Sequence, residues 1–365
     1  MASEPRWAAK EPGGDQTGLG GLNATGYSGA MKSPAIRHAF GLLKFLVPVA
    51  IIGWLLWRID AEEWAALRNQ PKNFGALAAA LMVAMSALLL TLLRWGLLVR
   101  CNGIRLSYAE ALRLGSIGFL LSFVSAGSVG GDLFKAIFLA RRAPGQRVEA
   151  VASVAVDRAV GLYGLLLVVV CVMLVAPPRA DQQIQQIAYW AAGLAAVGTL
   201  VLASLILGGR SIDRVVRRLG GFRYVGRLIH RVADPLRIFH THPKEFLIAV
   251  VMSLGVHVLL SISIYLIARG LYADAPTLAQ HLIIVPIAML VSALPISPAG
   301  IGLLEAAMHW LYALIPETPT QASGTLVALV FEIVKILLAL AGVVFYWTSG
   351  REVKESLSQA EVADV

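Results

Sequence analysis

Apolar residues fill six uninterrupted stretches of the chain, and each stretch is about as long as a membrane-spanning helix. The stretches cover residues 40–57, 74–99, 150–176, 187–208, 246–269 and 323–347. A helix needs about 17–25 mostly apolar residues to cross the hydrocarbon core of a bilayer. The pattern therefore predicts about six spanning helices, of which the first is weakened by Lys44 and Pro48.

Two further apolar segments are interrupted. The first, residues 115–141, is broken by the sequence SAGSVGG at 125–131, and the second, residues 281–315, by PISPAGIG at 295–302. Proline removes a backbone donor and glycine adopts conformations closed to other residues, so each segment should break and resume as a second short helix. Each side of a break has only about 13–16 residues, which is short for a span. This predicts two re-entrant hairpins, with a proline-kinked spanning helix or two full crossings as the alternatives.

A shift of 173 residues aligns the two halves of the chain. It places Asp132 on Glu305 and carries the apolar stretches 74–99 and 150–176 onto two others in the second half. Interrupted segments at matching positions of two halves point to a transporter-type binding site. The fold class predicted is an all-α integral membrane protein with inverted-repeat architecture, built from eight hydrophobic segments.

Composition supports a membrane protein and narrows its chemistry. The chain is 58% hydrophobic and 15% charged, with a mean hydropathy of +0.72, whereas soluble domains are about a quarter charged. The net charge of +9 lies in the loops, which favours anionic lipid headgroups as partners and not nucleic acid. Cys101 and Cys171 form no disulfide framework or metal spacing, and no ATP-binding loop occurs, so no cofactor is expected.

Basic residues are distributed unevenly between the loops. They concentrate before the first span, after the second span, after the first broken segment and in the loop 210–244. Loops rich in Lys and Arg stay in the cytoplasm, so both termini are predicted to be cytoplasmic, in the inner membrane. The first hairpin then enters from the cytoplasmic side and the second from the outer side, which makes 40–176 and 187–347 inverted repeats.

The remaining parts of the chain are polar or basic. Residues 1–35 are predicted to be a disordered cytoplasmic tail, residues 36–348 the membrane domain, and residues 349–365 a second cytoplasmic tail. In the loop 210–244, apolar residues recur at helical spacing between arginines, which predicts a basic amphipathic helix pair on an anionic leaflet. Its predicted lipid contacts are Arg214, Arg217, Arg218 and Arg227. A solvated charged loop is the alternative.

Ionisable residues recur inside the apolar segments, mostly in pairs that share a helix face. The pairs are Asp132 with Lys135, Glu305 with His309, and Glu332 with Lys335, the last a candidate structural or proton-relay pair. Residues three or four apart on a helix are neighbours. Asp157 and Arg158 are adjacent and cannot face each other, so each needs a partner elsewhere, which we expect across the hairpin.

Two interpretations of these charges remain open. Charges within a membrane are costly and by default indicate function, and the helix that restarts after each break would point its amides at an anionic group such as phosphate. The alternative is that the pairs only fix the hairpins in place. His257, alone in its span, is predicted to be a hydrogen-bonded packing residue, and Arg94 to extend its side chain to the membrane surface.

Three motifs carry a family resemblance. They are Gly130-Gly131-Asp132-x-x-Lys135, Asp157-Arg158-x-x-Gly161 and Pro295-x-Ser297-Pro298-x-Gly300-x-Gly302-x-x-Glu305. In this order they resemble the transmembrane region of lysylphosphatidylglycerol synthases, over about residues 40–345. Proteins similar in this region include the flippase half of the multiple peptide resistance factor and stand-alone proteins linked to hopanoid and isoprenoid lipids. The chain has no soluble aminoacyl-transferase domain, so the resemblance does not imply lipid lysinylation, and Ser125 stands where many relatives carry proline.

The resemblance implies flippase-like translocation of a lipid or lipid-linked headgroup between leaflets. The predicted headgroup path consists of Gly130, Gly131, Asp132, Lys135, Asp157, Arg158, Pro295, Ser297, Pro298, Gly300, Gly302 and Glu305. The predicted partners are membrane lipids with anionic or phosphate-bearing headgroups. The main alternative is a non-catalytic partner or anchor for a lipid glycosyltransferase or another envelope-lipid enzyme. An intramembrane enzyme is a third, disfavoured because no nucleophile–base or metal constellation occurs.

Overall fold

The described part of the chain is built from helices alone. The computed structural model describes residues 53, 54, 57, 61–124, 130–175, 182–207, 238–293 and 300–348, all within the unit formed by residues 41–365. Five helices are long and apolar enough to cross a membrane: α3 (Phe74–Cys101), α6 (Arg147–Val175), α7 (Gln182–Leu207), α11 (Pro243–Leu271) and α14 (Gly324–Trp347). The prediction of an all-α integral membrane protein is confirmed, and the predicted span 40–57 lies almost wholly outside the described residues.

The two broken segments each form a pair of short helices. The first pair is α4 (Tyr108–Val124) with α5 (Gly130–Arg142), and the second is α12 (Leu278–Ser292) with α13 (Leu303–Leu314). The helices of each pair pack against each other. At 1.5 Å per residue, the 17 residues of α4 extend over about 26 Å, less than the ~30 Å of a hydrocarbon core. The breaks themselves, 125–129 and 294–299, lie outside the described residues.

Each hairpin leaves and returns at one end of the helix that precedes it. The end of α3, the start of α4 and the end of α5 line one cavity, to which Arg100, Tyr108 and Arg142 all contribute. In the second hairpin, His281 at the start of α12 hydrogen-bonds through Nε2 to the Tyr312 hydroxyl near the end of α13, at 2.7 Å. Each pair therefore returns to the end from which it started, which excludes a single proline-kinked spanning helix.

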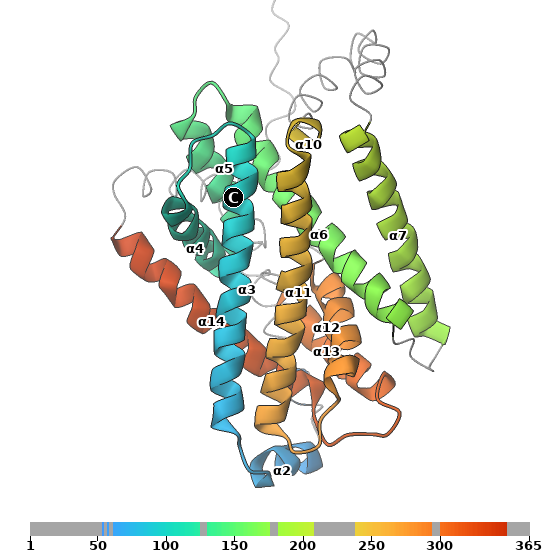
Figure 1. Cartoon of the computed structure of the whole chain (residues 1–365). Coiled ribbons are helices and arrows are strands. Elements are labelled where there is room, and N and C mark those ends of the chain that lie inside the picture. The colour runs from blue at the N-terminus through green and yellow to red at the C-terminus, as the bar shows by residue number, and fades with distance from the viewer. Residues whose placement is uncertain are drawn as a thin grey trace, which may run out of the picture. The chain divides into compact units, whose positions relative to one another are not determined.

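The helices α3 and α11 are antiparallel, so the two hairpins enter from opposite ends. The Asn73 N–H, just before α3, donates to the Gly270 carbonyl near the end of α11 at 2.9 Å, while Leu98 and Phe246 share an apolar cluster at the other end. Figure 1 shows α3 and α11 side by side, with α4 and α5 toward one end and α12 and α13 toward the other.

The structure reproduces the 173-residue repeat. Adding 173 to the bounds of α5 gives 303–315, and α13 spans Leu303–Leu314. Short helices also precede α3 and α11, namely α2 (Ala61–Asn69) and α10 (Ile238–Thr241). Local caps fix two starts: the Asn73 side chain accepts from the Ala76 N–H before α3, and Thr277 with Gln280 forms a capping box before α12.

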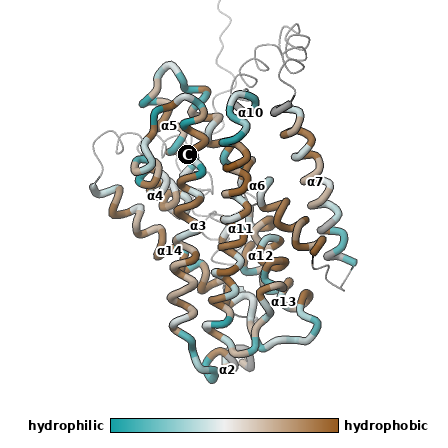
Figure 2. The backbone as a smooth tube through the Cα atoms, in the orientation of Figure 1, coloured by the Kyte–Doolittle hydropathy of each residue, from teal (hydrophilic) through white to brown (hydrophobic). Residues whose placement is uncertain are grey.

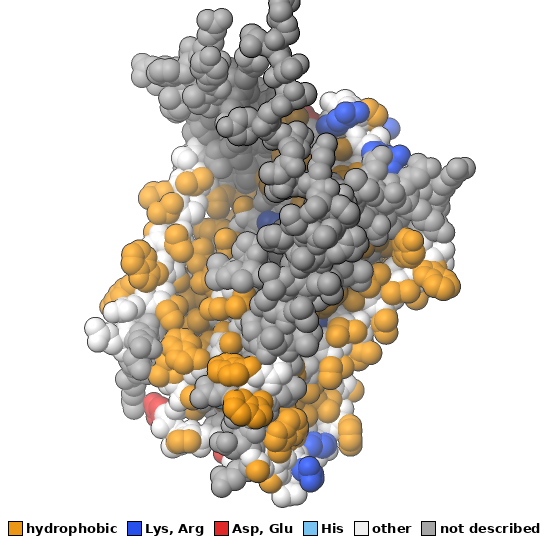
Figure 3. All heavy atoms as spheres, turned by 180° about the vertical axis from the view of Figure 1, so that it is seen from behind, with side chains coloured by type: hydrophobic (Ala, Val, Ile, Leu, Met, Phe, Trp, Pro, Cys, Tyr) orange, Lys and Arg blue, Asp and Glu red, His pale blue; other side chains and the backbone are white. Residues whose placement is uncertain are grey.

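The surface between the helix ends is apolar. The hydropathy of the backbone changes from hydrophobic in the long helices to hydrophilic in the connections at either end (Figure 2). Seen from behind, hydrophobic side chains cover much of the described face, while Lys and Arg gather near its ends (Figure 3). The helix α7 is the least buried span; it packs on α6, where Tyr163 Oη lies 2.8 Å from Thr199 Oγ1. Such a surface suits lipid acyl chains.

Candidate functional site

The first hairpin depends on glycine because its two helices touch through their backbones. Gly130 and Gly131 are buried and begin α5. A Cβ added at Gly131 would lie 1.9 Å from the carbonyl oxygen of Gly118 on α4 and 2.6 Å from Ser122 Oγ. Any side chain here would push α5 away from α4, so this glycine fixes how closely the hairpin closes.

The second hairpin uses glycine differently, for backbone conformation. Gly300 and Gly302 have φ values of +75° and +89°, in the region that other residues rarely adopt. The Gly302 N–H donates to Glu305 Oε2 at 2.6 Å, so the carboxylate caps the start of its own helix α13. The three remaining residues predicted at this break, Pro295, Ser297 and Pro298, lie outside the described residues.

Three charged side chains form a group behind the break of the first hairpin, which we call the first-hairpin cluster: Asp132, Lys135 and Arg158. Asp132 Oδ2 accepts a hydrogen bond from Arg158 Nε on α6, and Lys135 Nζ lies 3.6 Å from Asp132 Oδ1. Lys135 Nζ also lies 5.0 Å from the ring centroid of Trp95 on α3, a cation–π contact. The predicted partner of Arg158 across the hairpin is confirmed. With two cations and one carboxylate, the cluster carries an excess positive charge.

Asp157, whose charge also acts on Arg158, pairs with Arg94, a partner on α3 and not across the hairpin. Arg94 Nε donates to Asp157 Oδ1 at 2.9 Å, and Arg94 Nη1 donates to Ser253 Oγ on α11 at 3.0 Å. The prediction that Arg94 extends to the membrane surface is wrong: its side chain is only 6% exposed. The carboxylate of Asp157 and the hydroxyl of Ser253 bond the guanidinium inside the protein, so Arg94 joins three helices and Asp157 does not line an open path.

Small residues make room for this junction. A Cβ at Gly161 would lie 3.3 Å from Arg94 Nη2, and one at Gly164 would lie 2.2 Å from Ser253 Oγ. His257 Nε2 lies at hydrogen-bond distance, 3.0 Å, from the Gly161 carbonyl oxygen. This contact confirms His257 as a hydrogen-bonded packing residue. Sequence reasoning missed Ser253, because a single serine in an apolar helix gives no signal of its own.

A second group, the second-hairpin cluster, consists of Glu305, Glu332 and Lys335. Lys335 Nζ lies 2.6 Å from Glu332 Oε1, an ion pair that is not aligned as a hydrogen bond. Glu305 is 0% exposed, and its carboxylate interacts electrostatically with both residues. Within the described part of the chain, Glu305 Oε1 and Glu332 Oε2 have no hydrogen-bond partner. The cluster therefore holds two buried carboxylates and one amine.

The expected pairing of Glu305 with His309 is wrong. Glu305 is the third residue of α13 and its side chain turns back to the Gly302 N–H, whereas His309 is exposed. A capping interaction at a helix start competes with the neighbour one turn ahead. Sequence spacing alone did not reveal this competition, because the first residue of α13 was not known.

The described ends of both hairpins approach the same residue of α14. Lys335 Nζ lies 5.8 Å from the ring centroid of Phe123, at the end of α4 before the first break, and Glu305, just after the second break, interacts with the same amine. Between the two clusters, the described residues show no direct ion pair. The sequence prediction placed Asp132, Lys135, Asp157, Arg158 and Glu305 on one headgroup path. In the structure, Glu305 lies with Glu332 and Lys335, and Asp157 pairs with Arg94.

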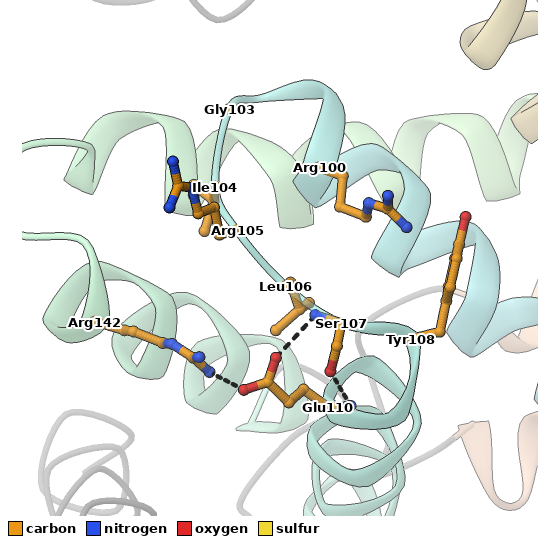
Figure 4. Close-up of a pocket in the computed structure, with 9 residues that line it drawn as sticks. All are labelled: Arg100, Gly103, Ile104, Arg105, Leu106, Ser107, Tyr108, Glu110 and Arg142. Atoms are coloured by element: carbon orange, nitrogen blue, oxygen red, sulfur yellow. Dashed lines mark hydrogen bonds and ion pairs between the residues drawn. The ribbon is translucent and has the colours of Figure 1, made fainter.

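A cavity of about 600 Å³ opens at the outer end of the first hairpin (Figure 4). Arg142 pairs with Glu110 at 2.6 Å, and Arg100 lies over the ring of Tyr108 at 4.6 Å. A hydrogen bond from the Ser107 backbone N–H, together with Arg142, lowers the pKa of Glu110 despite partial burial. Arg105 adds a third guanidinium to the lining. The sequence indicated basic residues here but not the cavity they line.

Some predicted site residues lie outside the described residues. Arg214, Arg217, Arg218 and Arg227, the predicted anionic-lipid contacts, lie outside them. Within the part of the chain that the structure describes, no group of three or more His, Cys, Asp or Glu side chains could hold a metal ion.

Comparison with known proteins assigns the family. The model of the lysylphosphatidylglycerol synthase TM region matches residues 41–342, which contain both broken hairpins and both charged clusters. No curated protein and no solved structure matches the chain. This TM region is not itself the catalytic domain of the synthase. The chain therefore belongs to the lysylphosphatidylglycerol synthase TM region family, a family of multi-pass membrane proteins of a lipid-related, flippase-like type.

Proposed function

We propose that the protein moves a lipid with an anionic, phosphate-bearing headgroup between the leaflets of a membrane, and that the first-hairpin cluster binds the headgroup. The observation that carries this proposal is the excess positive charge of Asp132, Lys135 and Arg158 within an apolar surround. A buried or half-buried excess charge is costly unless a counter-charge arrives. A phosphate supplies that charge.

The geometry of the cluster suits a phosphate in two ways. Arg158 is 60% exposed although it bonds Asp132, so its other guanidinium N–H groups are available for bidentate recognition of an oxyanion. The cluster also lies at the first turn of α5, a helix of 13 residues, where free N–H groups and the helix dipole favour an anion. A phosphate would thus replace part of the Asp132 interaction when it binds.

The cavity at the outer end of the first hairpin provides the route of approach. Its arginines lie at the end of the molecule that the positive-charge bias assigns to the cytoplasm, so a headgroup of the inner leaflet would meet Arg100, Arg105 and Arg142 first. In this proposed orientation both termini lie in the cytoplasm, and the membrane is the inner membrane. The basic loop with Arg214 remains the predicted contact to anionic lipids near this end.

Exchange measurements in liposomes test the proposal. The full chain is reconstituted with fluorescent phosphatidylglycerol or phosphatidylcholine of identical acyl chains, and lipid exposed on the outer leaflet is quenched chemically. Exchange should favour the anionic lipid. Since a hydrogen bond to a charged group contributes about 1.5–3 kcal/mol, Arg158→Gln should slow anionic exchange about tenfold or more.

A matched control separates this effect from a general loss of charge. Arg141→Gln removes one exposed arginine from the last turn of the same helix α5 and should leave the rate near wild type. Equal exchange of both lipids, or equal rates in Arg158→Gln and Arg141→Gln, would contradict the proposal. No exchange of any lipid, with co-purification of a lipid glycosyltransferase, would support the partner alternative instead.

A further inference from the structure

The second-hairpin cluster has an unbalanced charge. Glu305 and Glu332 provide two carboxylates, and Lys335 provides one amine that lies 2.6 Å from Glu332 Oε1. Glu305 is 0% exposed and Glu332 is 5% exposed. If both carboxylates were ionised, one negative charge would be buried without a counter-ion among the described residues, which is strongly unfavourable in an apolar interior.

Among the described residues, no neighbouring helix supplies a second cation to this cluster. Of the helices that pack against α13, α12 carries only His281, which is bonded to the Thr277 carbonyl and the Tyr312 hydroxyl, and α14 carries Glu332 and Lys335. Helices packed against α12 or α14 bring Asp157, Arg94, Arg158 and His257, all of which are bonded elsewhere. On α4, Phe123 approaches Lys335, while Glu110 pairs with Arg142 and Arg113 lies ten residues before Phe123, about 15 Å along the helix. The two hairpin breaks, 125–129 and 294–299, contain no ionisable side chain.

The hydrogen-bond pattern also lacks one donor. Glu305 Oε2 accepts from the Gly302 N–H, but Glu305 Oε1 and Glu332 Oε2 have no partner among the described residues. Buried carboxylate oxygens without partners are rare. One proton on the carboxylate pair would supply a donor and remove the excess charge at the same time, because two neighbouring carboxylates share a proton more readily than both ionise.

We propose that Glu305 and Glu332 together hold one exchangeable proton, and that its release and uptake accompany movement of the second hairpin. With the proton in place the cluster is neutral and α13 packs against α14. When the proton leaves to water, the Glu305 carboxylate remains bonded to the Gly302 N–H but repels Glu332, so α13 with its glycine turn moves toward a wetter position. No other group changes its charge in this step.

This inference rests on the proposed lipid translocation and adds a coupling ion to it. The first-hairpin cluster would take up one negative phosphate while the second-hairpin cluster carries one proton. A phosphodiester headgroup and a proton moving in the same direction transfer no net charge. A proton gradient could then drive the transport. The printed sequence contains no ATP-binding loop of the G-x-x-x-x-G-K-[ST] type.

Infrared spectroscopy of the purified full chain in detergent tests the proton directly, without any transport. The wild type should show a carboxylic-acid C=O band that shifts in D₂O and disappears as the pH is raised. Glu305→Gln and Glu332→Gln should each abolish the band, since one carboxylate then remains for one amine. Asp132→Asn is the control: it removes a carboxylate that is bonded to Arg158 and should leave the band intact.

A further variant keeps the test decisive if the glutamine variants fail to fold. Lys335→Met removes the only amine, so both carboxylates should be protonated and the band should about double. Absence of a wild-type band at every pH where the protein is folded, or a band that Lys335→Met leaves unchanged, would overturn the proposal. Loss of the band on addition of Na⁺ at constant pH would do so too, because a metal cation would then be the ligand.

Transport measurements then test the coupling. Anionic-lipid exchange by the wild type should respond to a pH difference across the liposome, and exchange by Glu305→Gln should not. If the wild type moves lipid but a pH difference has no effect, the coupling is wrong while the proposed function stands. If no lipid moves at all, the proposed function fails, and the infrared result still decides whether the proton is there.

Discussion

Asp132 and Glu305 occupy the same place in the two halves of the protein, each in the first turn of the helix that follows a break, yet their surroundings differ. Asp132 contacts two cations, Arg158 and Lys135. Glu305 contacts one backbone N–H and lies near a second carboxylate, Glu332. One carboxylate lies in a region of excess positive charge and the other in a region of excess negative charge.

The two halves share a backbone arrangement, so each could have carried the same charges. Instead, their different charges suit the halves to different ligands. In the proposed function the first half presents its cations to an anionic headgroup, and the Arg158 side chain is 60% exposed. In the second half the carboxylates are buried, and the ligand proposed there is a proton. An inverted repeat can therefore keep its helices in register while the charges inside each half are specialised.

The largest effect is expected at the charge pair that makes the first half rigid. Arg94→Met leaves Asp157 buried and unpaired, which should cost about 3–5 kcal/mol and lower the unfolding midpoint in detergent strongly. The double variant Arg94→Met/Asp157→Leu should recover most of that loss, because an apolar pair replaces the charges. If the double variant is as unstable as the single one, the Arg94 pair is not what joins α3 to α6.

The next prediction compares how the two hairpins use glycine. Gly131→Ala would place a Cβ 1.9 Å from the Gly118 carbonyl oxygen, and forcing α4 and α5 apart should cost about 3 kcal/mol, the upper end for overpacking. Gly302→Ala puts an alanine at φ of +89° and ψ of −42°, a conformation that other residues rarely adopt, and should cost about 1–2 kcal/mol. Denaturant unfolding of both variants checks the order; a larger loss at Gly302 would show that the glycine turn limits stability.

The two carboxylates should themselves respond differently to neutralisation. Asp132→Asn weakens its bonds to two cations and should cost about 1.5 kcal/mol, at the low end because Arg158 is partly exposed. Glu305→Gln keeps an oxygen for the Gly302 N–H and removes a buried acid, so it should cost less than about 1 kcal/mol. The reverse order of melting temperatures would contradict the contrast between the halves.

The smallest effect concerns the ends of the hairpins that lie away from the breaks. The first is closed by the Arg142–Glu110 ion pair and the second by the His281–Tyr312 hydrogen bond. The folded pKa of Glu110 lies below its ordinary value of 4.5, so its contribution is present above that pH and is lost as the pH falls through the folded pKa. The loss should be under about 1 kcal/mol and absent in Glu110→Gln, as thermal unfolding between neutral and acid pH would show.

Features set by local spacing could be predicted from the sequence. Proline and glycine within apolar runs located both hairpins, and the 173-residue shift related α5 to α13. Residues three apart on one helix, such as Glu332 and Lys335, pair in the structure as their spacing requires. These inferences need only the geometry of one helix.

Features that depend on the rotation of one helix against another could not be predicted. Arg94 lies seven residues before the end of α3, about 10 Å at 1.5 Å per residue, close enough for a flexible side chain to reach the surface. Only the packing of α6 and α11 shows that Asp157 and Ser253 already face it. The fate of Glu305 likewise depended on where α13 begins.

The helix α7, the least buried of the spans, explains why the second half has the inverted orientation. The helix α3 crosses the membrane, the first hairpin (α4 and α5) returns to the side where α3 ends, and α6 crosses back. The first half therefore ends on the side where α3 began. Without a further crossing, α11 would start there and run parallel to α3. The single crossing of α7, whose end packs on α10, reverses the parity. Its sequence is then constrained by length and apolarity more than by contacts, and a foreign spanning helix of equal length should serve in its place.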